Sequence, residues 1–82
     1  MVEVIWTDSF RDDVSRIRDN SVKEKIRKHV EKILGDSQIG KPLRYGMKGE
    51  RTIRIAAYRL IYKKEGAVLI LLRFEHRRGV YG

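Results

Sequence analysis

The segment RTIRIAAYRLIYKKEGAVLILLR, residues 51–73, decides the fold of this chain. Apolar and polar side chains alternate along its first part, with Ile53 and Ile55 on one face and Thr52 and Arg54 on the other. A period of two is typical of a β-strand that has one buried face. The segment therefore predicts a β-sheet with one face packed on a core and a second, more polar face.

We divide this segment into three strands, over residues 51–57, 58–63 and 67–73, with a hairpin turn at 64–66. The last strand is apolar on both faces until Arg73, so we expect it to be the central strand. The step between the first two strands lacks the Gly or Asn that a two-residue turn prefers. The sequence therefore leaves the boundary between these two strands open.

The first half of the chain predicts one strand and two helices. Residues 2–6 alternate as a short strand does, and apolar residues at helical spacing indicate a first helix over 8–19. A second helix is expected to begin at Ser21, because its hydroxyl and the Glu24 side chain fit a capping box. Residues 36–49 are expected to form a loop, since glycines punctuate them. The apolar stripe of the second helix consists of Val22, Ile26, Val30, Ile33 and Leu34.

Together these elements predict an α+β fold with the order β-α-α-β-β-β. We expect a single domain over residues 1–82, in which a helical hairpin packs on one face of a small, mainly antiparallel sheet. No predicted element remains to cover the other face of that sheet. A functional site is therefore expected on the uncovered face.

The net charge of +8 is confined to the second half of the chain. Residues 1–40 hold eight basic and eight acidic residues, whereas residues 41–82 hold eleven basic and three acidic residues. A one-sided excess of positive charge is the pattern expected of a protein that binds a polyanion. A generally basic protein without such a partner is the simpler alternative.

Arginines from different parts of the second half are expected to meet on the uncovered face of the sheet. Neighbouring strands lie about 4.8 Å apart, so side chains from three strands can converge on a patch the size of a few nucleotides. Like charges at this spacing repel one another unless an anion binds between them. The planar guanidinium suits phosphate, which it grips with two parallel hydrogen bonds. The arginines concerned are Arg54, Arg59, Arg73, Arg77 and Arg78.

Cleavage of RNA by its own ribose 2′-hydroxyl needs a base, an acid and cations around the reacting phosphate. The sequence offers two groups for proton transfer, Tyr81 and His76. Neighbouring arginines favour a phenolate, and the imidazole titrates near neutral pH without help. Since no histidine pair or close carboxylate pair has metal-ligand spacing, we expect neither a metal nor another cofactor.

The composition narrows the setting in which the protein works. The chain has no cysteine, so it lacks disulfides and thiolate zinc sites, which suits a reducing cytoplasm. Its longest apolar run, residues 67–72, is too short to span a bilayer, and no signal-peptide pattern is found. We therefore expect a cytoplasmic protein without a membrane partner.

Nearly the whole chain, residues 41–82 together with the two predicted helices before them, resembles the RelE/ParE superfamily of toxins from toxin–antitoxin systems, and within it the RelE branch. The resemblance rests on Pro42-Leu43 after the helices, on the hairpin from Arg51 to Tyr62, and on the closing HRRGVY of residues 76–81. It implies a ribosome-dependent mRNA endoribonuclease that halts translation. It also implies a RelB-like antitoxin as partner, in a toxin–antitoxin hetero-oligomer, with the ribosome and mRNA as targets.

The resemblance also implies roles for particular residues. Arg59 matches the arginine that contacts the scissile phosphate, Arg77 the second catalytic arginine, and Tyr81 the proposed general base, so these three are the catalytic candidates. A second basic position of the hairpin falls on either Thr52 or Arg51. The candidates for RNA binding are Arg51, Arg54, Arg73, His76, Arg78, Lys48 and Arg44.

Two other functions fit the same sequence. Members of the ParE branch keep the fold but inhibit DNA gyrase, and they lack the nuclease residues. A basic nucleic-acid-binding module without toxicity is the third possibility. The joint presence of Arg59, Arg77 and Tyr81 favours RNA cleavage over gyrase inhibition.

Overall fold

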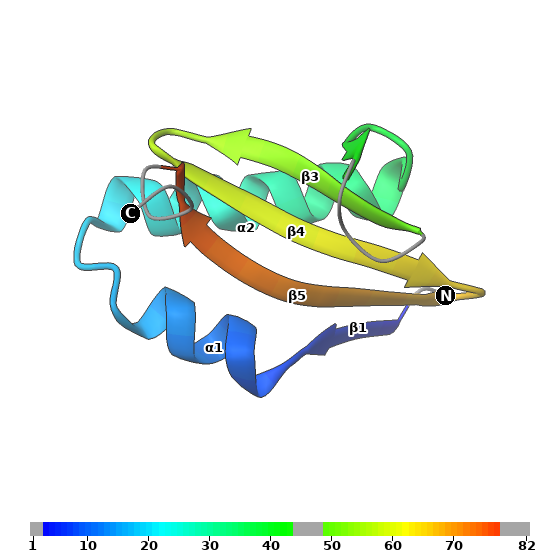
Figure 1. The fold of residues 1–82 in the computed structure, drawn as a ribbon, viewed down its shortest axis with the longest axis horizontal. Helices are drawn as coiled ribbons and strands as arrows, with labels where there is room; N and C mark the ends of the chain where they lie inside the picture. The colour runs from blue at the N-terminus through cyan, green and yellow to red at the C-terminus, as the bar shows by residue number, and fades with distance from the viewer. Residues whose placement is uncertain (1–2, 44–48, 78–82) are drawn as a thin grey trace.

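A computed structural model describes residues 3–43 and 49–77 of the chain. Within these ranges two helices and five strands follow one another along the sequence, and the helices run antiparallel to each other (Figure 1). The elements are β1 (Glu3–Trp6), α1 (Asp8–Ser15), α2 (Asn20–Gly35), β2 (Lys41–Pro42), β3 (Glu50–Ile55), β4 (Tyr58–Glu65) and β5 (Val68–His76).

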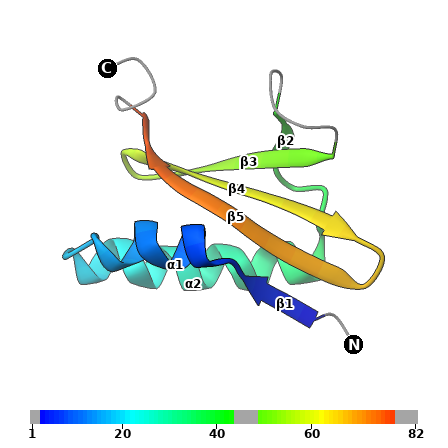
Figure 2. The same ribbon diagram turned by 60° about the horizontal axis from the view of Figure 1, so that its bottom comes forward.

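The strands form one sheet in the order β1-β5-β4-β3-β2. β1 pairs with β5 in parallel, and the other three pairings are antiparallel. Both helices lie against the same face of the sheet (Figure 2). The structure therefore confirms the expected α+β fold, with a helical hairpin on one face of a small, mainly antiparallel sheet. We call the face opposite the helices the open face.

The sheet differs from the expectation in several places. The strand expected to be central, over residues 67–73, corresponds to β5, which lies between β1 and β4, so the middle strand of the five is β4. β4 and β5 also extend beyond the expected 58–63 and 67–73. The loop expected over residues 36–49 contains the two-residue strand β2, which is too short to produce a periodic pattern. The strand expected over 51–57 ends at Ile55, and a two-residue turn follows in which Ala56 has φ 55°. This conformation costs an alanine more than a glycine. The pairing of Ile55 with Tyr58 across the hairpin holds the turn in place.

The end of α1 and the start of α2 differ from the expected boundaries. α1 ends at Ser15 rather than at residue 19. α2 begins at Asn20, and its N-cap is Asp19. The Asp19 carboxylate accepts hydrogen bonds from the Ser21 amide at 2.9 Å and the Ser21 hydroxyl at 2.7 Å, and these bonds lower the pKa of Asp19. The expected capping box is therefore wrong.

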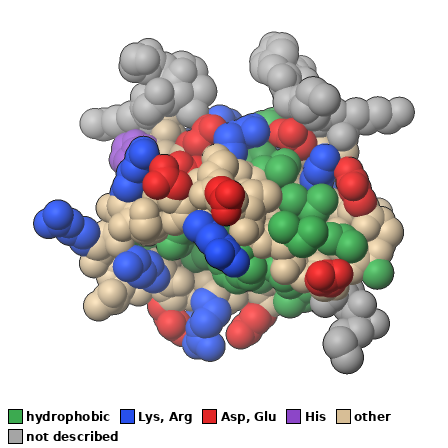
Figure 3. All heavy atoms as spheres, turned by 90° about the horizontal axis from the view of Figure 1, so that it is seen from below, with side chains coloured by type: hydrophobic (Ala, Val, Ile, Leu, Met, Phe, Trp, Pro, Cys, Tyr) green, Lys and Arg blue, Asp and Glu red, His purple; other side chains and the backbone are tan. Residues whose placement is uncertain are grey.

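The core lies between the helices and the sheet. Its centre is Phe10 of α1, which is fully buried and places its ring near those of Trp6 and Phe74, with centroid distances of 5.5 and 6.2 Å. The expected apolar stripe of α2 is buried against the sheet except for Leu34, which is exposed. Apolar side chains also reach the surface on the side of the molecule that carries α1 and β1 (Figure 3). Ile5 and Trp6 of β1 are both exposed apolar residues.

Tyr62 joins the sheet to the segment that follows α2. Its buried hydroxyl donates to the Ser37 carbonyl at 2.7 Å and accepts from the Gly40 amide at 3.0 Å. A Cβ atom at Gly40 would lie 2.7 Å from the Tyr62 hydroxyl oxygen, so only glycine permits this approach. Burial raises the pKa of Tyr62, because the phenolate would lose its hydration.

We expect Tyr62→Phe to lower the free energy of unfolding by about 1–3 kcal/mol, because it leaves the Ser37 carbonyl and the Gly40 amide without this partner. The raised pKa stabilises the fold below the usual tyrosine value of about 10 and loses its effect as the pH rises through the higher folded pKa. Urea titrations at neutral and strongly alkaline pH should show a smaller alkaline loss in the variant. An equal loss in both proteins would contradict this role.

Candidate functional site on the open face of the sheet

Three strands place charged side chains in one row across the open face. Arg54 of β3 pairs with Arg59 of β4, and Arg59 pairs in turn with Glu75 of β5. Paired residues on neighbouring strands point to the same side of a sheet. Two arginines therefore lie directly opposite each other, with a carboxylate on the far side of Arg59.

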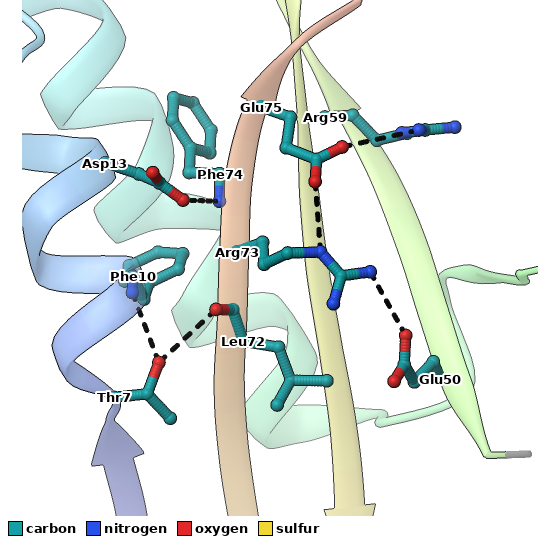
Figure 4. Close-up of polar contacts among 9 residues, drawn as sticks. All are labelled: Thr7, Phe10, Asp13, Glu50, Arg59, Leu72, Arg73, Phe74 and Glu75. Carbon is teal, nitrogen blue, oxygen red and sulfur yellow. Dashed lines mark hydrogen bonds and ion pairs between the residues drawn. The ribbon is translucent and has the colours of Figure 1, made fainter. Parts of the chain in front are cut away.

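Ion pairs extend this row along the sheet. Glu75 contacts Arg59 through Oε2, 3.5 Å from Nη2, and contacts Arg73 through Oε1, 3.0 Å from Nε. Arg73 then reaches Glu50, with 3.3 Å between its Nη2 and a Glu50 oxygen. The close-up shows the resulting chain of side chains across β4, β5 and β3 (Figure 4). We call Arg54, Arg59, Arg73, Glu50 and Glu75 the arginine row.

A β-bulge in β5 puts Arg73 on the open face. The register with β4 shifts between Ile61 and Tyr62, so that Leu72 is an extra residue between Leu71 and Arg73. Leu71 faces the helices, and strict alternation from it would turn Arg73 toward them as well. The bulge reverses the alternation, so that Phe74 enters the core and Arg73 and Glu75 face outward.

Helix α1 and the residue before it hold the bulge in place. The Thr7 hydroxyl can donate to either of two carbonyls of β5. It lies 2.7 Å from that of Leu71 and 3.3 Å from that of Leu72 (Figure 4). The Asp13 carboxylate accepts a hydrogen bond of 2.9 Å from the Phe74 amide. β1 pairs with β5 only as far as Leu71. These two polar side chains therefore satisfy backbone groups of β5 beyond the end of β1.

Two buried polar atoms on the open face have no hydrogen-bond partner in the part of the chain that the structure describes. They are the Nε of Arg59 and the Oγ1 of Thr52. An unpaired buried donor costs free energy comparable to a lost hydrogen bond, and such groups are uncommon in folded proteins. Thr52 lies two residues before Arg54 on β3, so both atoms face the same side of the sheet. Unpaired buried polar atoms of this kind suit a polar ligand or an ordered water.

Of the other predicted site residues, the structure describes Arg77 and His76, and it places them on different parts of the sheet. Arg77 is exposed, and its amide donates to the Ala57 carbonyl at 2.9 Å, so it lies at the end of the sheet that carries Arg54 and Arg59. His76 pairs with Tyr58, and their rings meet edge to face at 5.1 Å. Since Tyr58 packs against the core, His76 belongs to the opposite side of the sheet from Arg59. Arg78, Tyr81, Lys48 and Arg44 lie outside the described residues.

Arg51 does not join the arginine row. Its Nη1 donates to the Gly40 carbonyl at 2.7 Å, and it pairs with Tyr62, which faces the helices. The alternation that puts Ile53 in the core also puts Arg51 on that side. Arg51 therefore holds the segment after α2 against the sheet through its hydrogen bond to Gly40. Its position does not support the expectation that it binds RNA.

Sequence reasoning missed Glu50 and Glu75, which partly neutralise the arginines. Glu50 is buried, with 7% of its surface exposed, and it contacts Arg73. The signal for Glu75 was its position two residues after Arg73, which puts both side chains on one face of a strand. The described residues contain no group of three His, Cys, Asp or Glu side chains that could hold a metal ion.

A second surface feature is an apolar groove between the two helices, next to the end of β1. It has a volume of about 460 Å³ and is lined largely by apolar atoms of Trp6, Phe10, Val14 and Ile26. Its charged lining residues are Arg11, Lys23 and Arg27, and no acidic residue lines it within the described ranges. Neither α1 nor α2 has the length and hydropathy needed to cross a bilayer.

Solved structures with this fold define a class of proteins. The chain is similar to a chain of the RelB–RelE antitoxin–toxin complex of Methanococcus jannaschii, with a TM-score of 0.76, 19% identity, and coverage of 98% of this chain and 95% of that one. It is also similar to a chain of the RelBE2 toxin–antitoxin complex of Mycobacterium tuberculosis, with a TM-score of 0.76, 24% identity, and coverage of 93% and 98%. A chain of the chromosomal ParDE system of P. aeruginosa gives a TM-score of 0.70, 18% identity, and coverage of 93% and 96%. The fold is thus that of the small RelE-like toxins.

The sequence itself gives the family. Residues 4–81 match the family model of the ParE toxin of type II toxin–antitoxin systems, parDE. The chain therefore belongs to the ParE toxin family and is a toxin of a type II toxin–antitoxin system. A search of curated protein sequences finds no significant match.

Proposed function

We propose that this toxin is an mRNA endoribonuclease that cuts messages held by the ribosome and so stops translation in the cytoplasm. The observation that carries this proposal is the environment of Arg59. Arg59 lies opposite Arg54 on the open face, and its buried Nε–H has no partner among the described residues. Two opposed guanidiniums with an unpaired donor suit a phosphate, which relieves the repulsion and accepts the hydrogen bond.

In this proposal the arginines stabilise charge while other groups move protons. Arg59 and Arg77 would bind the oxygens of the phosphate as the ribose 2′-hydroxyl attacks it, since charge develops there in the transition state. Arg54 would bind the RNA backbone next to the reacting phosphate. Tyr81 is the proposed base, because guanidiniums close to a tyrosine would favour its phenolate. His76, the other group expected to move a proton or bind RNA, lies on the opposite side of the sheet from Arg59, so its position does not support either role.

The ribosome has a physical role in this scheme. A site with few groups for proton transfer depends on a substrate that is already in the reactive geometry. A message fixed in the ribosome meets this need, whereas free RNA samples many conformations. We therefore expect cleavage of translated messages and little cleavage of free RNA.

Gyrase inhibition is the second candidate function. The family model that matches the chain is the ParE model, and the two carboxylates of the arginine row reduce its positive charge. A toxin that acts by binding a protein has no need of a strongly cationic phosphate site. In a cell, the nuclease function would lead to broken messages, whereas gyrase inhibition would lead to damaged DNA.

Induction of the toxin in growing bacteria separates these functions. The nuclease proposal predicts rapid loss of protein synthesis and mRNA cuts at regular codon positions. Gyrase inhibition predicts a DNA-damage response while messages stay intact. Normal growth would count against both functions for this chain.

The partner that we propose is a RelB-like antitoxin that inserts an acidic amphipathic segment into the groove between α1 and α2. An apolar floor with basic residues at its border is complementary to a helix that carries apolar and acidic side chains. Trp6, of which 39% is exposed, gives the groove an aromatic anchor, a residue type that often dominates binding energy. Glu24 and Glu31 already pair with Arg27, so Arg11 and Lys23 are the cations proposed to meet the partner.

We expect Arg11→Glu combined with Lys23→Glu to weaken antitoxin binding by about 100-fold, because both attractions become repulsions. Toxicity should persist, since the groove lies on the helix side of the sheet. Calorimetric titration with the purified antitoxin measures the change. As a matched control, Lys25→Glu combined with Lys28→Glu alters α2 outside the groove and should change the affinity far less. Equal losses in both pairs would place the antitoxin elsewhere.

A further inference from the structure

The arginine row is close to neutral although the chain is strongly basic. Its three arginines face two glutamates, which leaves one positive charge on a face of a protein whose net charge is +8. Glu75 is the carboxylate that touches two of these arginines (Figure 4). The proposed phosphate site thus contains a built-in anion.

Glu75 meets Arg59 on the edge that phosphate would use. A guanidinium grips phosphate side-on through Nε–H and Nη2–H, which point in the same direction. Glu75 lies 3.5 Å from Nη2 of Arg59, while Nε on the same edge is buried and unpaired among the described residues. A phosphate therefore reaches both donors only when the carboxylate moves aside.

The contact between Glu75 and Arg59 contributes little to folding. The two side chains are 33% and 29% exposed, and 3.5 Å is long for a charge-assisted hydrogen bond. The pair between Glu75 and Arg73 is shorter, at 3.0 Å, and it keeps the carboxylate beside the row. The pair with Arg73 thus accounts for the position of the carboxylate, whereas its long contact with Arg59 adds little stability and can be displaced by a phosphate.

We propose that Glu75 determines the substrate selectivity of the toxin by weakening the affinity of the open face for free RNA. This inference rests on the proposed nuclease function. The carboxylate competes with every phosphate, but a message held on the ribosome is presented at high effective concentration and overcomes the competition. Free RNA in the cell lacks this advantage and is released.

The test compares two substitutions that each remove one negative charge from the sheet. Glu75→Gln leaves an amide oxygen for Arg73 and turns a neutral group toward Arg59. Glu65→Gln is the matched control, because Glu65 pairs with Lys63 at 3.0 Å near the far end of β4. Affinity for a short fluorescent single-stranded RNA is measured by anisotropy over a range of salt concentrations.

We expect Glu75→Gln to bind this RNA about five- to tenfold more tightly than the wild type, and its salt dependence to steepen by about 0.7, the slope of one further phosphate contact. Glu65→Gln should change the affinity less than about twofold, and Glu75→Asp, which keeps the charge, should stay near the wild type. If glutamine disturbs folding, Glu75→Thr removes the same charge and suits a β-strand. Equal effects of Glu75→Gln and Glu65→Gln, or weaker binding by Glu75→Gln, would overturn the proposal.

Cleavage is measured separately from this affinity. If wild-type toxin leaves translated messages intact, the nuclease function is contradicted. The ratio of RNA affinities between Glu75→Gln and the wild type would still show whether Glu75 weakens RNA binding. Cleavage of translated messages with unchanged free-RNA affinity in Glu75→Gln would instead reject the role of Glu75 alone. With both proposals correct, Glu75→Gln also cuts free RNA faster than the wild type does.

Discussion

Replacement of Arg59 by alanine is expected to abolish toxicity, with cleavage of translated mRNA reduced by at least about 100-fold. The change removes a guanidinium that the proposal places on the reacting phosphate, and loss of one such donor typically costs a factor of about 10²–10³ in rate. The fold should survive, because Arg59 lies on the open face and its ion pair with Glu75 is long. The rate is measured by primer extension on messages from a translation reaction.

Lys63→Ala is the control for this experiment. Lys63 lies on the same strand and the same face as Arg59, four residues further along. Its ammonium forms an ion pair with Glu65, although Glu50 of the arginine row lies opposite it on β3. We expect its removal to leave the cleavage rate within about twofold, because it is remote from the proposed phosphate. Full toxicity of a folded Arg59→Ala variant would reject the site.

The largest effect on stability is expected from Phe10→Ala. Phe10 is fully buried between Trp6 and Phe74, and it is the only described residue of α1 whose side chain is buried. Truncation of a buried phenylalanine costs about 3–5 kcal/mol, against a total stability of about 5–15 kcal/mol for domains in general. We expect the melting temperature to fall by at least about 15 °C, measured by circular dichroism.

Ile39→Ala is the matched control, since it also shortens an apolar side chain. Ile39 is 42% exposed, and substitutions at such positions usually stay within about 0.5 kcal/mol. A similar melting temperature for the Phe10 and Ile39 variants would show that α1 is not anchored through Phe10. Loss of that anchor would also disturb β5, because Thr7 and Asp13, at either side of Phe10, hold the bulge.

The fold followed from the sequence where periodic patterns were long. The alternation around Ile53 and the stripe from Val22 to Ile33 led to the correct layers, because burial of one apolar face provides most of the stability of both elements. The predicted helix boundaries were wrong where a single local interaction determines where a helix begins. Asp19 and Ser21 are both good N-cap residues, and only the folded geometry selects Asp19.

The site followed from the sequence less completely. Alternation correctly put Arg54 and Arg59 on the open face, and the same rule puts Arg51 on the side of the core, against the RNA-binding role expected of it. The position of Arg73 depends on the bulge at Leu72, for which the sequence carries no glycine or other marker. The neutralising role of Glu50 and Glu75 depends on which strands are neighbours, which a linear pattern does not give.

The most direct test of the central claim adds purified toxin to a reconstituted translation reaction and maps the 5′ ends of the message. The proposal predicts cuts in register with codons, dependent on ribosomes, that disappear with Arg59→Ala and persist with Lys63→Ala. Intact message in that reaction, together with inhibition of DNA supercoiling by purified gyrase, would contradict the nuclease function.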